Sequence, residues 1–296
     1  MMRVFYSPEY VGSGYAFDTT RKARWIADSL LKSPLPGIEL AEPEPLTWNQ
    51  VAAVHDPGYV RAVETGVPRE LAESQGFRWD VGLWPMVLAS NGGVVAAARA
   101  ALEQGVAGSL SSGLHHARQE RGAGFCTFNG LVIAAQAALA AGARSVLILD
   151  LDAHCGGGTA SLIAGEPRIW QVDVSFSSVD SYRSTERVRR AMVVAAPEYL
   201  LTVKRMLHEV GQQCREFDLC LYNAGMDPFE FCPIGGQAGV TQPILADRES
   251  MVFDWCAGRR LPIAFVLAGG YVGPGLDECG LVSLHRLTLS AAVHKS

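Results

Sequence analysis

The stretch that decides the fold is residues 145–158, SVLILDLDAHCGGG, in which a short apolar run passes directly into polar side chains. Residues 146–149 are all branched and aliphatic, which is typical of a parallel strand covered on both faces. Two carboxylates and an imidazole follow at alternate positions, as Asp150, Asp152 and His154. The stretch therefore predicts a buried strand with a cluster of polar groups at its carboxyl end.

Strand-like and helix-like segments alternate on both sides of this stretch. Further strands are expected at RIWQVDV (168–174), FDLCLYN (217–223) and PIAFVLA (262–268). Helices are expected at 85–105 (interrupted at Asn91-Gly92-Gly93), 128–142, 197–212 and 243–257. This alternation predicts an α/β fold in which a central parallel sheet is flanked by helices in three layers. We expect one domain over residues 1–296, with the Pro-rich stretch 33–45 as a surface loop.

The composition excludes several classes of function. Of the 296 residues, 49% are hydrophobic and 19% are charged, which is a globular balance. The formal net charge is −5 and no run of Lys and Arg exceeds two residues, so we expect no nucleic-acid partner.

The cysteines and the apolar segments bear on location. Seven cysteines are scattered without any Cys-x-x-Cys pair, which indicates reduced thiols in a cytoplasmic compartment. The first ten residues lack the apolar core of a secretory signal, and no uninterrupted apolar stretch reaches about 20 residues. We therefore expect a cytoplasmic protein with no membrane partner.

The polar groups at the strand ends suggest a metal site. Asp152 and His154 are two residues apart, so in an extended segment both point to one face, and Asp227 follows another predicted strand. Two carboxylates and one imidazole match the three protein ligands of a catalytic zinc, although this set also tolerates iron. Asp150, two residues before Asp152, could orient a histidine.

Each of these signals also has a purely structural interpretation. Asp152 could be a helix cap, and Tyr271 could be an aromatic packed beside the Gly269-Gly270 turn. The glycines of GGGTAS (156–161) favour a tight turn over a phosphate cradle, since no Lys follows. Lone histidines are usually structural, which we expect of His208, His285 and His294. These interpretations leave unexplained why three strand ends and a tandem His115-His116 converge on one edge of the sheet.

Several motifs resemble one known family when they are taken in order. They are GLHHA (113–117), GFCTFNG (124–130), DLDAHCGGGT (150–159), YNAGMD (222–227) and GGY (269–271). This order is similar to that of the zinc-dependent histone deacetylases, a family that includes acetylpolyamine amidohydrolases, and looks closest to class IV enzymes and their bacterial relatives. The resemblance spans about residues 5–271 and implies the arginase/deacetylase α/β domain.

The resemblance also implies roles for individual residues. Asp152, His154 and Asp227 would be the zinc ligands, and a structural K⁺ ion is a further cofactor of the family.

The remaining implied roles concern the reaction and its substrate channel. His116 would be the general base, His115 its electrostatic partner held by Asp150, and Tyr271 the hydrogen-bond donor to the developing oxyanion. Gly124 and Phe125 would line the channel for the acyl-lysine stem. Arg24 would be the basic residue near an internal channel.

The chain departs from the family pattern at several places. Cys155 replaces a second histidine, and Ser112-Gly113 replaces a Pro-Gly pair. Gly157 replaces an Asn or Asp that supports the second histidine of the tandem pair, which puts the orientation of His116 in question.

Three functions follow, and the sequence leaves them open. The first is removal of an acetyl or longer acyl group from the ε-amine of lysine in a protein or peptide. The second is deacetylation of a small amine such as an acetylpolyamine, for which Asp56 and Asp80 are candidate rim carboxylates. The third is a silent module that binds a metal or an acyl ligand. The oligomeric state is also open.

Overall fold

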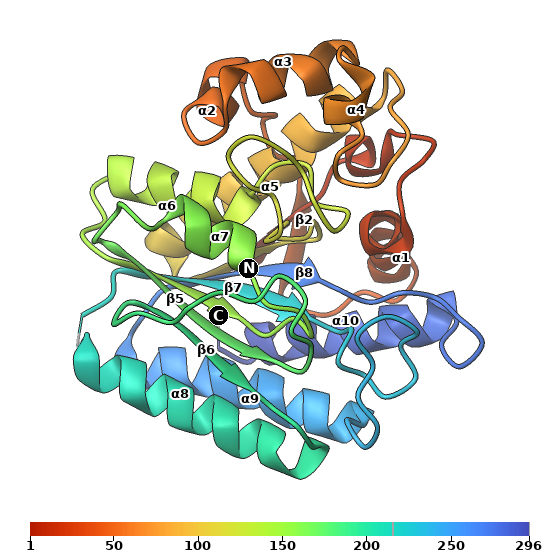
Figure 1. Cartoon of the computed structure of the whole chain (residues 1–296). Helices are drawn as coiled ribbons and strands as arrows, with labels where there is room; N and C mark the ends of the chain where they lie inside the picture. The colour runs from red at the N-terminus through yellow and green to blue at the C-terminus, as the bar shows by residue number, and fades with distance from the viewer. Residues whose placement is uncertain (215, 296) are drawn as a thin grey trace.

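A computed structural model describes residues 1–214 and 216–295. In these residues eight strands form one parallel sheet in the order β2-β1-β3-β8-β7-β4-β5-β6 (Figure 1). The strands are β1 (Met2–Phe5), β2 (Ile38–Ala41), β3 (Val106–Ser109), β4 (Val146–Asp150), β5 (Ile169–Ser175), β6 (Val188–Met192), β7 (Leu219–Gly225) and β8 (Ile263–Ala268). The predicted α/β class with a central parallel sheet is confirmed.

Helices cover both faces of this sheet and make the three layers. In Figure 1, α8, α9 and α10 lie below the sheet, while α5, α6 and α7 lie above it with α2–α4 beyond them. Helix α1 packs against α10, and its apolar residues share one core cluster with α8, α9 and α10. The helices are α1 (Asp18–Lys32), α2 (Trp48–Ala52), α3 (Pro57–Thr65), α4 (Arg69–Ala72), α5 (Leu83–Gln104), α6 (Gly130–Ala140), α7 (Gly157–Leu162), α8 (Tyr199–Gln213), α9 (Gln242–Arg259) and α10 (Glu278–Val293), with short 3₁₀ turns at Pro8–Val11 and Ala196–Glu198.

The long apolar segments of the sequence match the structure best. The four predicted strands are β5, β7, β8 and the β4 of the opening stretch, each within a few residues of its expected bounds. Helices α6, α8 and α9 likewise lie where they were predicted.

The Pro-rich stretch 33–45 was predicted to be a surface loop, but it contains the strand β2. This strand pairs in parallel with β1 at the edge of the sheet, from Met2 opposite Ile38 to Phe5 opposite Ala41. It has only four residues, none of them fully buried, so it lacks the continuous apolar run that marks a central strand.

The predicted interruption at Asn91-Gly92-Gly93 was wrong, since α5 runs unbroken through it. The two glycines allow neighbouring segments to pack closely against α5, and they do not break the helix. A Cβ atom on Gly92 would overlap the carbonyl oxygen of Glu44, and one on Gly93 would overlap the hydroxyl of Tyr10. Tertiary contact therefore overrides the low helix propensity of glycine here.

Helix α5 also has the length and composition of a membrane span, the one such helix in the described residues. Its most apolar window is 67% buried inside the protein, and it packs against α6, β3 and β8. Core helices pass the same test, so this feature is weak evidence for a membrane.

The GGGTAS segment forms the start of α7 where a tight turn was favoured. The amide of Gly158 in its first turn donates to the Asp180 carboxylate at 3.0 Å. A negative charge therefore already occupies this helix end, which argues against the phosphate interpretation.

Candidate active site

The centre of the sheet brings the predicted ligands together. Strands β7 and β4 are neighbours, with Asp150 opposite Asn223, so the segments after them begin side by side. Asp152, His154 and Asp227 each offer one ligand atom, and these atoms lie within 4.8 Å of one another. His154 Nδ1 is 3.0 Å from Asp152 Oδ1 and 3.0 Å from Asp227 Oδ2.

The electrostatics of this group suit a cation. Asp152 and Asp227 are almost fully buried, and Asp227 Oδ2 has no hydrogen-bond donor among the described residues besides its close contact with the His154 ring. Burial, followed by the charge of Asp152, raises the pKa of Asp227 to about 7. Burial opposes a charged His154, but the two carboxylates prevail and raise its pKa to about 11. The positive charge of a protonated His154 thus balances the two carboxylates. A divalent ion would fit the same donor set and would supply that positive charge instead.

The tandem histidines lie beside these residues and touch each other. His115 Nδ1 is 2.7 Å from Asp150 Oδ2, and its Nε2 is 3.1 Å from His116 Nε2. Asp150 is held in turn by the side-chain amide of Asn223 at 2.8 Å. Burial alone would lower the pKa of His115, yet Asp150 and Asp152 raise it to about 10. His115 is therefore the charged member of the pair, and burial followed by that charge lowers the pKa of His116.

His116 has a carboxylate partner that the sequence did not reveal. Its Nδ1 lies 2.9 Å from Asp180 Oδ2, in the loop that follows β5. Gly157, where the family pattern has an Asn or Asp, offers no side chain, so the support comes from another segment. Asp180 is 64 residues from His116 and belongs to none of the motifs, so no local signal could have found it.

The predicted channel residues pack against the histidines. Gly124 has φ +50°, and a Cβ atom there would overlap the ring of His116, so the position requires glycine. Phe125 stacks on Phe17 with ring centroids 4.2 Å apart, and its ring is 6.0 Å from that of Tyr271. The half-exposed Phe17 was not predicted; it immediately precedes α1 and extends this aromatic wall.

Tyr271 lies next to the carboxylates at the end of β8. The two preceding glycines have positive φ, and a Cβ atom on Gly269 would overlap Asp227 Oδ1. The turn therefore brings the backbone close to the carboxylate of Asp227. Burial, followed by the charges of Asp227 and Asp152, raises the pKa of Tyr271, which keeps its hydroxyl protonated and able to donate.

The basic residue beside this turn is Lys22, and the assignment to Arg24 was wrong. Arg24 is exposed, two positions along α1, whereas Lys22 is fully buried. Lys22 Nζ donates to the carbonyl of Gly269 at 2.6 Å and to Thr19 Oγ1 at 3.1 Å. The helical periodicity of α1 could have distinguished Lys22 from Arg24. Lys22 lies on the buried face of the helix with Ala23 and Ile26.

One histidine that was not predicted supports the tandem-histidine loop. His55 is buried, with Nδ1 2.8 Å from the carbonyl of Arg118 and Nε2 accepting from the amide of Asn129 at 2.9 Å. The Asn129 side chain donates to the carbonyls of His115 and Ala117. His208 and His294 are exposed on other parts of the surface, and His285 is buried near Gly270.

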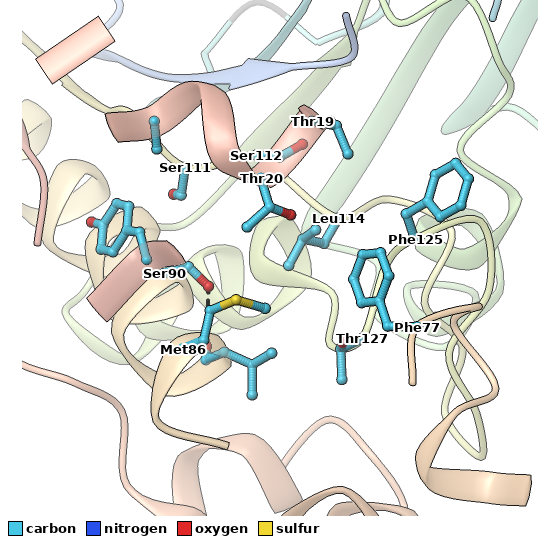
Figure 2. A pocket seen from close by; sticks show the side chains of 13 residues that line it. Thr19, Thr20, Phe77, Met86, Ser90, Ser111, Ser112, Leu114, Phe125 and Thr127 are labelled. Carbon is cyan, nitrogen blue, oxygen red and sulfur yellow. Dashed lines mark hydrogen bonds between the residues drawn. The ribbon is translucent and has the colours of Figure 1, made fainter. Parts of the chain in front are cut away.

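A pocket opens behind Phe125, between α1, α5 and the loop before His115. Figure 2 shows Phe125, Leu114 and Met86 around it, with hydroxyls from Thr20 and Ser90. Its lining is thus apolar with scattered hydroxyl groups.

Comparison with known proteins agrees with this geometry. The family described as "Histone deacetylase domain" matches residues 17–287. The chain belongs to this family. Membership identifies it as a hydrolase of the deacetylase type, with a potential metal-binding triad at Asp152, His154 and Asp227.

Similar proteins come from several branches of the histone deacetylase family. An uncharacterized protein of Picosynechococcus sp. is 33% identical over 81% of this chain and 80% of its own length. Histone deacetylase 2 of Arabidopsis thaliana is 29% identical over 61% of this chain, and acetylpolyamine amidohydrolase 2 of Pseudomonas aeruginosa is 35% identical over 61%. The chain covers only 48% and 54% of these last two relatives.

Solved structures share the fold over the whole chain. The HD domain of HDA15 superposes with a TM-score of 0.82, covering 100% of this chain and 90% of the other, at 19% identity. An acetylpolyamine aminohydrolase from Burkholderia pseudomallei gives a TM-score of 0.80, covering 98% of both chains, at 20% identity.

Proposed function

We propose that this deacetylase-family hydrolase removes an acetyl or longer acyl group from the ε-amine of acyl-lysine in a protein or peptide. The observation that carries the proposal is the packing of two groups against each other. The Asp152, His154 and Asp227 triad lies beside a tandem histidine pair whose outer ring nitrogens both face carboxylates.

Hydrolysis of an amide needs an activated water, a donor for the oxyanion and a proton for the leaving amine. Zinc held by Asp152, His154 and Asp227 would lower the pKa of a water and polarise the substrate carbonyl. His116, with its lowered pKa, is the member of the pair suited to accept a proton and later return it to the amine. Tyr271 keeps its proton and would donate to the oxyanion.

The metal is part of the proposal. The donor set suits zinc and also iron, and the resemblance implies a structural K⁺ as well. A chain with seven free cysteines suits a reducing location, and we propose the cytoplasm.

A small acetylated amine is the second candidate, because an acetylpolyamine amidohydrolase is among the relatives. The two carboxylates considered for a cationic substrate have other partners. Asp56 caps α3 through the amides of Gly58 and Tyr59, and Asp80 accepts from the amide of Gly14 at 2.8 Å. This engagement favours lysine over a polyamine.

The silent-module alternative loses its main support through Asp180. Its basis was the missing polar residue at 157, and a carboxylate contacts His116 nonetheless.

The test is release of amine from three substrates by zinc-reconstituted protein: an acetyl-lysine peptide, the same peptide with an octanoyl group, and an acetylated polyamine. We expect turnover of the peptides above that of the polyamine, and none by Asp152→Ala under the same conditions. The pocket behind Phe125 has a volume of only about 20 Å³, so the octanoyl peptide tests whether the site accepts a long acyl chain. Preference for the polyamine would contradict the lysine assignment, and equal inactivity of both proteins on all three would contradict the hydrolase proposal.

A further inference from the structure

The contact between His116 and Asp180 joins two segments that the family motifs do not connect. His116 lies in the loop between β3 and α6, and Asp180 lies in the connection from β5 to β6. The position at which the sequence pattern expects the supporting polar residue, Gly157, is the first residue of α7.

Asp180 is held on both carboxylate oxygens. Its Oδ2 lies 2.9 Å from His116 Nδ1 and 3.0 Å from the amide of Gly158. Its Oδ1 pairs with the guanidinium of Arg118, two residues after His116. The Asp180 side chain is only 12% exposed, so these partners replace most of its water.

Gly157 and Asp180 compete for the same space. A Cβ atom on Gly157 would overlap the backbone oxygen of Asp180 and lie 2.5 Å from its Oδ1. The close approach is between the two backbones, so it would not be relieved by a change of side-chain rotamer. Glycine at 157 is therefore the condition under which the loop can bring Asp180 to His116.

We propose that Asp180 is the positioning residue of the general base, and that it has taken over this role from position 157. By accepting from Nδ1–H, Asp180 fixes the tautomer in which His116 Nε2 is free of a proton and faces His115 and the reacting atoms. The inference rests on the proposed function, because it assigns His116 as the base.

The first test compares Asp180→Asn and Asp180→Ala with the wild type in their zinc-loaded forms. We expect kcat on the preferred acyl substrate to fall by about 10–100-fold, which is the usual effect of losing such a support. KM should stay within about threefold and zinc should remain at one ion per chain, because Asp180 contacts neither substrate nor metal ligand. Glu186→Asn, an exposed acid in the same connection, is the matched control and should leave kcat unchanged. Wild-type kcat in Asp180→Ala would overturn the proposal.

The second test uses the close approach at position 157. Gly157→Ala should lower both kcat and thermal stability, because its Cβ would overlap the backbone oxygen of Asp180 and push the loop away from His116. Gly165→Ala, which has no neighbouring atom within 4 Å, is the matched control and should lower neither. Wild-type kcat in Gly157→Ala would contradict the coupling.

A spectroscopic test separates this inference from the proposed function. In ¹⁵N-histidine spectra of the zinc-loaded protein, with signals assigned by His116→Gln, His116 should carry its proton on Nδ1, and Asp180→Ala should change that tautomer. An unchanged His116 spectrum would overturn the role of Asp180. If the wild type hydrolyses no substrate but Asp180→Ala shifts the tautomer, then the proposed function fails while the positioning role stands.

Discussion

At the residue scale, His115, His116 and Tyr271 differ in how readily they lose or accept a proton. His115 is flanked by Asp150 and Asp152 and is charged, whereas His116 is buried beside that charge and is the weaker base. Tyr271 stays protonated because both burial and the neighbouring carboxylates oppose its ionisation. One acceptor and one donor of a proton therefore lie next to the same potential metal-binding triad.

The hydroxyl of Tyr271 gives a direct prediction. Tyr271→Phe should lower kcat on the preferred acyl substrate by about 10²–10³, the usual cost of removing one oxyanion donor. Zinc content should stay at one ion per chain, since the hydroxyl is not among the ligand atoms. Steady-state kinetics with metal analysis makes the measurement, and the exposed Tyr15→Phe is the control. An unchanged kcat in Tyr271→Phe would exclude the proposed donor role.

His55 predicts how stability depends on pH. Burial lowers its pKa from 6.5 to about 4, although its hydrogen bond to the carbonyl of Arg118 acts in the opposite direction. Between these values the unfolded chain binds the proton and the folded chain does not. The contribution of His55 is thus complete above pH 6.5 and is lost as the pH falls to about 4. It amounts to about 3 kcal/mol, at about 1.4 kcal/mol for each tenfold change in proton affinity.

Urea unfolding of wild type and His55→Gln between pH 4 and 7 would measure this effect. We expect a steeper loss of unfolding free energy on acidification in the wild type than in the variant. Parallel curves would show that His55 does not carry the pH dependence.

At the element scale, α5 shows where tertiary packing replaces local propensity. Gly93→Ala should destabilise the protein by about 1–3 kcal/mol, because its Cβ would overlap the Tyr10 hydroxyl and come within 2.7 Å of Ser109 Oγ. The matched control is Gly258→Ala in α9, which has no neighbouring atom within 4 Å and should stabilise by about 0.5–1 kcal/mol. Denaturant unfolding of both variants measures the two changes in unfolding free energy. Changes of the same sign would contradict this prediction.

The same scale explains what could be predicted from sequence. Strands β4, β5, β7 and β8 carry apolar runs and were predicted. The four-residue β1 and β3 and the half-exposed edge strands β2 and β6 carry little signal and were not predicted. The potential metal-binding triad of Asp152, His154 and Asp227 could be predicted because these residues follow apolar runs closely. Asp180, His55 and Lys22 were missed because each acts through a contact that only folding creates, across 64, 74 and 247 residues.

At the scale of the whole molecule, the strand order decides where the chemistry lies. Strands β8, β7 and β4 are adjacent in the middle of the sheet, so Tyr271, Asp227 and the Asp152–His154 pair follow neighbouring strands. The carboxylates at these strand ends are almost fully buried, which strengthens the electrostatic interactions among them. The loops that carry His116 and Asp180 close over the same edge. One end of one sheet thus gathers residues from more than half of the chain.

The central claim is that the Asp152, His154 and Asp227 triad holds the metal on which hydrolysis depends. The most direct measurement is amine release from the preferred acyl substrate while metal-stripped protein is titrated with zinc. We predict no release without metal, a linear rise, and a plateau at one equivalent of zinc per chain. Full activity of the stripped protein in the presence of a chelator would contradict the account.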